Sequence, residues 1–202
     1  MDATRIIDAA RKIHAAYRRD AAARYALLEE WTLPPVRCRL VGVAPFRYDG
    51  RLVSVAPEEP PDLDRIVITV HPYAAESGVC DGCSLSPDLR GCAEAALFHD
   101  PWYLEMDNMA ESTGIPVRDL RRLGDAVFGA LCSALGAPGP LARLYYSAVR
   151  WLGGLYHAAK GRLALLAAVL VALAVAGCSG GCAVPDILDG DPAAPVFEKV
   201  SP

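Results

Sequence analysis

The sequence lacks a basic tract and has no apolar run at its N-terminus. Its 202 residues include 20 basic and 24 acidic side chains, and residues 1–162 hold 19 and 20 of these, so this part is close to neutral. A near-neutral chain lacks the electrostatic footprint of nucleic-acid binding, and no nucleic-acid partner is expected. Arg5, Asp8, Arg11 and Lys12 interrupt every apolar stretch near the N-terminus, so no secretion signal is expected there.

The seven cysteines do not have the pattern of a disulfide framework, because their number is odd and their spacing is loose. Cys80-Asp-Gly-Cys83 resembles the start of a zinc knuckle, with Cys92 and His99 as further ligands. The spacing from Cys83 to Cys92 does not match a zinc site, so buried thiols are the favoured interpretation. A thioredoxin-like redox motif would need a surrounding βαβ pattern, which this sequence does not show.

One long apolar run dominates the C-terminal part of the chain. No residue from Leu163 to Val184 is charged, and a helix of this length reaches about 33 Å, enough to cross a hydrocarbon core of about 30 Å. A buried core helix is the alternative for its Leu-, Ala- and Val-rich part. Four basic residues precede the run and four acidic residues follow it: Arg143, Arg150, Lys160 and Arg162, then Asp186, Asp189, Asp191 and Glu198.

This charge asymmetry predicts a transmembrane signal anchor over residues 160–184. The positive-inside rule places the N-terminal domain in the cytoplasm and the short tail in the periplasm of a bacterial cell. Val175-Ala-Gly-Cys178 also looks like the lipobox of a bacterial lipoprotein signal, which makes Cys178 a candidate lipidation site. Such signals normally stand at the N-terminus, so the anchor is favoured. Residues 185–202 are acidic and have too little apolar surface to fold, and we expect them to be disordered.

The part of the chain before the anchor predicts an α+β domain over residues 36–158, preceded by an amphipathic helix in residues 1–33. Apolar side chains recur every three or four positions over residues 3–31. This helix would pack on the domain, join a partner helix or lie on the membrane surface. Strands are expected over 36–41, 46–55 and 65–71, with a hairpin turn at Asp49-Gly50. Helices are expected over 91–98, 101–112, 116–135 and 141–156. The expected fold is a small antiparallel sheet packed on three or four helices.

Four motifs place polar residues in apolar surroundings. They read D-G-C-S-L-S-P at 81–87, A-A-L-F-H-D-P-W-Y at 95–103, G-D-A-V-F at 124–128 and A-V-R-W-L-G at 148–153. In this order they resemble D-x-A-S-I/V-P, A-A-x-x-H-D-x-x-Y, A-D-x-x-F and A-V-R-x-x-G of an uncharacterised phage and prophage family, catalogued as domain of unknown function 1353. The resemblance covers about residues 36–154 and implies a phage or prophage origin. Pro101 after the His-Asp pair and Gly124 before the Asp depart from the family pattern.

These motifs contain candidate catalytic residues, namely Asp81, Ser84, His99, Asp100 and Asp125. Imidazole with carboxylates is a common ligand set in metal-dependent hydrolases, so His99, Asp100 and Asp125 are candidate ligands of a divalent metal. Ser84 or a metal-bound water would then be the nucleophile. The favoured alternative is a buried network in which these residues, Tyr103 and Arg150 pair with one another and fix the helix packing, with no cofactor.

Two functions are therefore open. The favoured one is a non-enzymatic phage or prophage accessory protein, anchored to the bacterial inner membrane or carried in the phage particle. It would be a virion or tail component or a modulator of the host envelope, with the N-terminal helix as a contact for other phage proteins. The alternative is a metal-dependent hydrolase acting near the cell envelope. The first is favoured because the sequence shows no complete catalytic set.

Overall fold

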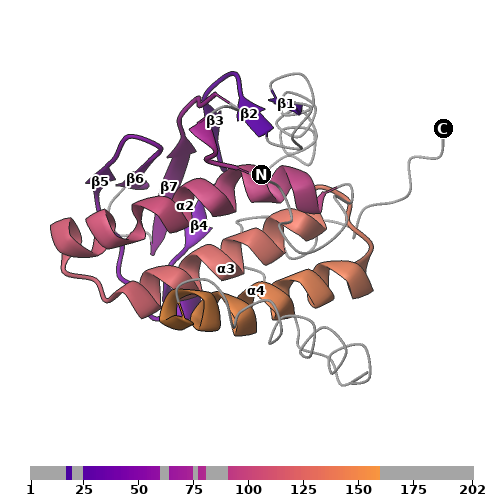
Figure 1. Ribbon diagram of the computed structural model, residues 1–202. Coiled ribbons are helices and arrows are strands. Elements are labelled where there is room, and N and C mark those ends of the chain that lie inside the picture. The colour runs from indigo at the N-terminus through magenta and orange to yellow at the C-terminus, as the bar shows by residue number, and fades with distance from the viewer. Residues whose placement is uncertain (1–16, 20–24, 60–63, 75–76, 81–90, 160–202) are drawn as a thin grey trace.

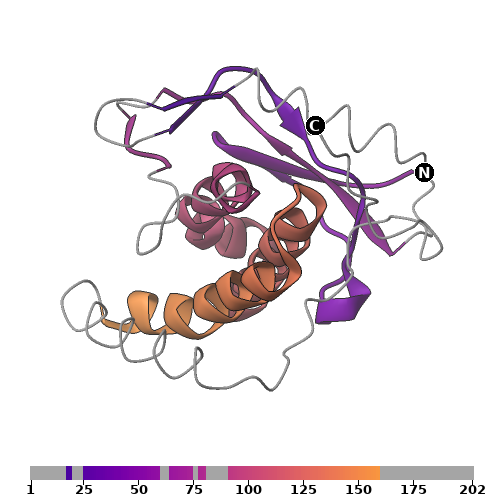
Figure 2. The ribbon, with the colours of Figure 1, turned by 90° about the vertical axis from the view of Figure 1, so that its right-hand side faces the viewer.

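The computed structural model describes residues 17–19, 25–59, 64–74, 77–80 and 91–159, with side chains described within these ranges from residue 25 to residue 150. Within these residues an antiparallel sheet packs against helices α2 (Cys92–Thr113), α3 (Val117–Ala134) and α4 (Gly139–Ala159). Figure 1 shows the three helices side by side in chain order, and Figure 2 shows the sheet curving along one side of them. The α+β architecture expected from the sequence is confirmed.

The main sheet is built around its longest strand, β7 (Arg65–Val70). Its neighbours are β3 (Trp31–Thr32) and β6 (Val53–Pro57), β5 (Tyr48–Asp49) lies beyond β6, and β4 (Val36–Arg37) also pairs with β7. Side chains of β7 alternate in burial, so Ile66, Ile68 and Val70 point into the core. The hairpin predicted at Asp49-Gly50 is confirmed, with the Gly50 N–H donating to the Val53 carbonyl at 3.1 Å.

The strand predicted over 36–41 is shorter than expected. It ends after Arg37 and gives way to a 3-10 turn, η1 (Arg39–Val41). The Arg39 N–H donates to the Asp64 carboxylate at 2.8 Å, so the chain turns where a strand would continue pairing with β7. Gly42 closes the turn with φ of 76°, a conformation that favours glycine.

The predicted N-terminal amphipathic helix is wrong over the described residues. Strand β1 (Tyr17–Arg19) pairs with β2 (Tyr25–Leu27), and β3 follows. All three residues of β2 are buried, and its N–H groups donate outward, from Tyr25 to the Cys80 carbonyl at 2.9 Å and from Leu27 to the Tyr73 carbonyl at 3.0 Å. These pairings with distant segments override the local helical period. Residues 1–16 and 20–24 of the predicted helix lie outside the described residues.

The prediction of two separate helices over 91–98 and 101–112 is also wrong. Helix α2 runs unbroken from Cys92 to Thr113 with Pro101 inside it. A proline has no N–H to donate to the carbonyl four residues earlier, here that of Leu97. The Tyr73 hydroxyl donates to this carbonyl instead, at 3.1 Å. Tyr73, in the segment that follows β7, therefore supplies the hydrogen bond that Pro101 removes.

Helices α3 and α4 confirm the helices predicted over 116–135 and 141–156 within a few residues. Trp102 explains why glycine precedes Asp125. The Trp102 indole N–H donates to the Leu120 carbonyl at 3.0 Å, and its ring lies so close to α3 that a Cβ at Gly124 would be 2.5 Å from Trp102 Nε1. The large side chain on α2 therefore requires the small residue on α3.

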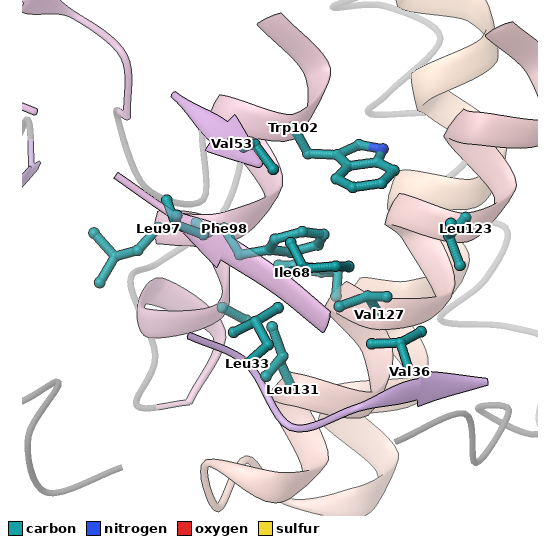
Figure 3. Packing of buried hydrophobic residues seen from close by; sticks show 14 of the residues in the cluster. Leu33, Val36, Val53, Ile68, Leu97, Phe98, Trp102, Leu123, Val127 and Leu131 are labelled. Atoms are coloured by element: carbon teal, nitrogen blue, oxygen red, sulfur yellow. The ribbon is translucent and has the colours of Figure 1, made fainter. Parts of the chain in front are cut away.

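The core lies between the sheet and helices α2 and α3. Figure 3 shows Ile68 of the sheet beside Phe98 of α2, with Trp102 of α2 and with Val127 and Leu123 of α3 in the same cluster. All five side chains are fully or almost fully buried. Burial of large side chains at about 25 cal/mol per Å² is the main favourable term for joining the helices to the sheet.

No helix in the part of the chain that the structure describes is long and apolar enough to cross a membrane. The predicted anchor at 160–184 and the predicted disordered tail at 185–202 lie outside the described residues. Helix α4 is described up to Ala159, the residue directly before Lys160 where the predicted anchor begins.

Replacing Tyr73 with Phe should lower the free energy of unfolding by about 1–2 kcal/mol, because the buried Leu97 carbonyl loses its donor. In a Pro101→Ala background the new backbone N–H can donate to Leu97, so Tyr73→Phe should be less destabilising there. Urea unfolding of the four proteins in a double-mutant cycle measures this coupling. Equal effects of Tyr73→Phe in both backgrounds would contradict the compensation.

Candidate functional site

Three of the five candidate catalytic residues come together in the described structure. His99 and Asp100 lie in the middle of α2, and Asp125 lies on the face of α3 that packs against it. Tyr103, four residues after His99, lies on the same face of α2, and Arg150 reaches Asp125 from α4. These five residues are called the His99 cluster below. Asp81 and Ser84 lie outside the described residues.

Asp125 is the centre of the His99 cluster and has no solvent-exposed surface. Its Oδ1 accepts a hydrogen bond from the Tyr103 hydroxyl at 2.6 Å and lies 3.4 Å from His99 Nε2. Its Oδ2 lies 3.8 Å from Arg150 Nη1. One buried carboxylate on α3 thus interacts with groups from both neighbouring helices. A buried carboxylate requires such partners, because leaving its charge unpaired in the protein interior is strongly destabilising.

His99 is held between two carboxylates. Its Nε2 faces Asp125, and its Nδ1 lies 3.6 Å from Asp100 Oδ1. The imidazole also contacts two aromatic rings, with ring centroids 4.3 Å away for Tyr103 and 4.8 Å away for Phe128. Both ring nitrogens therefore face carboxylates, and the ring contacts two aromatic side chains.

The two carboxylates favour the charged form of His99. Burial by itself lowers the pKa of His99, but hydrogen bonds to Asp100 and Asp125 and their negative charges together raise this pKa to about 9. At neutral pH the ring is then an imidazolium, which has no lone pair to bind a metal or accept a proton. Burial, followed by the charge of Asp125, also raises the pKa of Tyr103, so Tyr103 stays a hydrogen-bond donor.

The described residues contain no group of three or more His, Cys, Asp or Glu side chains arranged to hold a metal ion. The candidate ligands His99, Asp100 and Asp125 face one another as an ion-paired set, with charges of both signs. The larger set that adds Asp81 and Ser84 extends outside the described residues, so a divalent metal there stays a prediction from the sequence.

The cysteines and histidine of the possible zinc array have different partners. The Cys92 thiol hydrogen-bonds with the Cys132 thiol, the Cys80 thiol with the Tyr73 hydroxyl, and His99 with its two carboxylates. Cys83 lies outside the described residues. The pairing of Cys92 with Cys132 was not predicted, because nothing in the spacing of the cysteines indicates a contact between α2 and α3.

Comparison with family models, with curated proteins and with solved structures finds no match to this chain. The resemblance to the phage family therefore stays a prediction that depends on the four sequence motifs.

The stability of the wild-type protein should decrease between about pH 6.5 and pH 9 as His99 loses its proton. A pKa raised from 6.5 to about 9 on folding contributes stability that is fully present below pH 6.5 and lost as the pH rises through 9. The contribution is on the order of 3 kcal/mol at most. The check is Tm measured from pH 6 to pH 10 for wild type and His99→Gln, which should lack this decrease.

His71→Gln is the matched control, because it removes an imidazole that lies outside the His99 cluster, near Glu30 on the protein surface. It should keep the pH dependence of the wild type. Parallel Tm curves for wild type and His99→Gln would show that His99 is not charged in the folded protein.

Proposed function

We propose that this protein is a non-enzymatic phage or prophage accessory protein anchored to the bacterial inner membrane. Its domain would lie on the cytoplasmic side, and it would act as a virion or tail component or as a modulator of the host envelope. The phage origin is supported by the four ordered motifs, and the membrane location by the uncharged run from Leu163 to Val184 with its asymmetric flanking charges.

The observation that carries the non-enzymatic assignment is the pairing of His99 with Asp100 and Asp125. A general base needs an accessible lone pair near its substrate, and a metal ligand needs a neutral ring nitrogen. His99 is only 9% exposed, and each ring nitrogen faces a carboxylate. The same contacts connect α2 with α3, and Arg150 extends them to α4. This arrangement supports a role of the motif residues in helix packing.

Helix α4 supports a mechanical connection between the domain and the membrane. It packs on α3, and its Arg150 lies 3.8 Å from the buried Asp125. Its last described residue, Ala159, directly precedes the predicted anchor. In this proposal the ion pair of Arg150 with the buried Asp125 fixes the helix that leads to the membrane, so the domain would keep a defined position at the bilayer surface.

A chain tagged at both ends and expressed in a Gram-negative host should run at full length in the inner membrane and resist extraction by alkaline carbonate. Cys178→Ala should behave identically, since the anchor needs no lipidation. In spheroplasts, added protease should remove the C-terminal tag and leave the N-terminal tag. The double variant Leu170→Arg, Leu173→Arg should be released to the soluble fraction, because two charges at the centre of the run oppose insertion.

Recovery of the wild-type chain in the soluble fraction would overturn the membrane location. Cleavage of the wild type that Cys178→Ala prevents would instead identify the segment as a lipoprotein signal and the tail as a separate lipopeptide. Each outcome is visible on one blot with antibodies to the two tags.

The non-enzymatic assignment predicts that Asp125→Asn destabilises the domain, by about 3 kcal/mol, because Arg150 and His99 lose a buried counter-charge. Asp119→Asn is the matched control on the same helix. Asp119 pairs with Arg118 and Arg122 at the surface, and its loss should change stability by less than about 1 kcal/mol. Urea unfolding measures both variants.

Metal analysis of the same purified proteins tests the hydrolase alternative. We expect no stoichiometric divalent metal in the wild type. A stoichiometric metal that His99→Ala releases without lowering Tm would overturn the proposal and favour a metal-dependent hydrolase.

A further inference from the structure

The start of α2 and the end of α3 meet in very close contact. Gly91, directly before α2, has no room for a side chain, since a Cβ there would lie 2.8 Å from the Ala137 nitrogen and 3.1 Å from the Cys132 carbonyl oxygen. The next residue is Cys92, and its thiol hydrogen-bonds with the thiol of Cys132. The tight backbone contact at Gly91 thus places two cysteines, far apart in sequence, side by side.

The two thiols are buried together, and neither has solvent-exposed surface. Cys92 is the first residue of α2, where the partial positive charge of the helix N-terminus stabilises a thiolate. Its hydrogen bond with Cys132 lowers the pKa of Cys92 against the opposing effects of burial and of Glu94. Cys38 differs, because burial and then the charge of Asp64 raise its pKa to about 12. Cys92 is therefore a better nucleophile than the buried Cys38.

We propose that Cys92 and Cys132 form a redox modification site, in which hydrogen peroxide converts the two thiols into an intramolecular disulfide. A small, uncharged oxidant fits a site with no exposed surface better than a large one, because it needs only a slight local opening to enter. Hydrogen-bonded sulfurs are close enough for side-chain rotation and a small backbone shift to complete a bond of about 2.05 Å.

The reaction proceeds in two steps. The Cys92 thiolate attacks one peroxide oxygen, the O–O bond breaks, and Cys92 becomes a sulfenic acid. The hydroxide that leaves takes up the proton that the Cys92 thiol lost on becoming a thiolate, which gives the first water. The Cys132 sulfur then attacks the Cys92 sulfur, the S–O bond breaks, and the Cys132 proton leaves with the oxygen as a second water. Two thiols and one peroxide thus give one disulfide and two waters, and a thiol reductant reverses the change.

The disulfide would close a loop of about 40 residues that holds nearly all of α2 and most of α3. His99 and Asp125 both lie inside this loop, so oxidation would constrain α2 and α3, which carry four of the five residues of the His99 cluster. Constraining an unfolded chain with a loop of this length stabilises the folded state. The oxidised protein should therefore have a Tm about 10 °C above that of the reduced protein.

Peptide mapping of the full chain in detergent tests the proposal. After treatment with peroxide the protein is alkylated and digested with trypsin, which releases Cys92 in peptide 91–118 and Cys132 in peptide 123–143, each with one cysteine. We expect these two peptides to be linked, at the sum of their masses less two hydrogens, and to separate after treatment with dithiothreitol. Reduced protein should give the two peptides separately, each alkylated.

Cys38→Ser is the matched control, because it removes a different buried thiol and should leave the linked peptides unchanged. Cys132→Ser should abolish the link and leave Cys92 oxidised to a sulfinic or sulfonic acid. Peptide 91–118 linked to a cysteine other than Cys132, or both wild-type peptides recovered separately after peroxide, would overturn the proposal. The wild-type map decides the question by itself if the Cys132 variant does not fold.

Discussion

The packing of the three helices depends on the buried carboxylate of Asp125. A carboxylate with no contact with water is tolerated only where other groups replace its hydration. Here Tyr103 donates a hydrogen bond from α2, His99 contributes a second contact and a positive charge from the same helix, and Arg150 contributes a charge from α4. Because these partners belong to two helices on either side of α3, Asp125 specifies how all three lie together.

Helix α2 connects this cluster to the sheet. Pro101 leaves the Leu97 carbonyl without a backbone donor, and this carbonyl accepts a hydrogen bond from the Tyr73 hydroxyl. Farther along, the buried Glu105 accepts hydrogen bonds from the Tyr48 hydroxyl and from the Leu52 N–H at 2.9 Å, which fixes the β5–β6 hairpin on the helix. Each contact satisfies a buried polar group on α2 with a group from the β region. Helix α2 therefore connects the sheet with the His99 cluster and fixes their relative position.

The thiol pair and the ion pairs act at different places on the same two helices. Cys92 lies at the start of α2, and Cys132 lies near the end of α3. The residues that these two helices contribute to the His99 cluster lie nearer the middle of each helix. A change in the redox state of the thiols would alter how firmly the helices are joined without replacing any partner of Asp125. In the proposed membrane-anchored protein, α4 would convey the position of this helical core to the bilayer, since Arg150 is its ionic contact with Asp125.

The sequence by itself determined the elements whose patterns are local. Strand β7, the Asp49-Gly50 hairpin and helix α3 each have a pattern that depends on neighbouring residues, and each of these elements was predicted. Tertiary structure decided the rest, because the deciding hydrogen bonds join distant segments. Tyr25–Leu27 became a strand through pairing with Tyr73 and Cys80, and α2 continued past Pro101 because Tyr73 replaced the missing donor. Polar residue types indicated the His99 cluster, but only packing brought Cys92 against Cys132, since no local pattern encodes a contact between two helices.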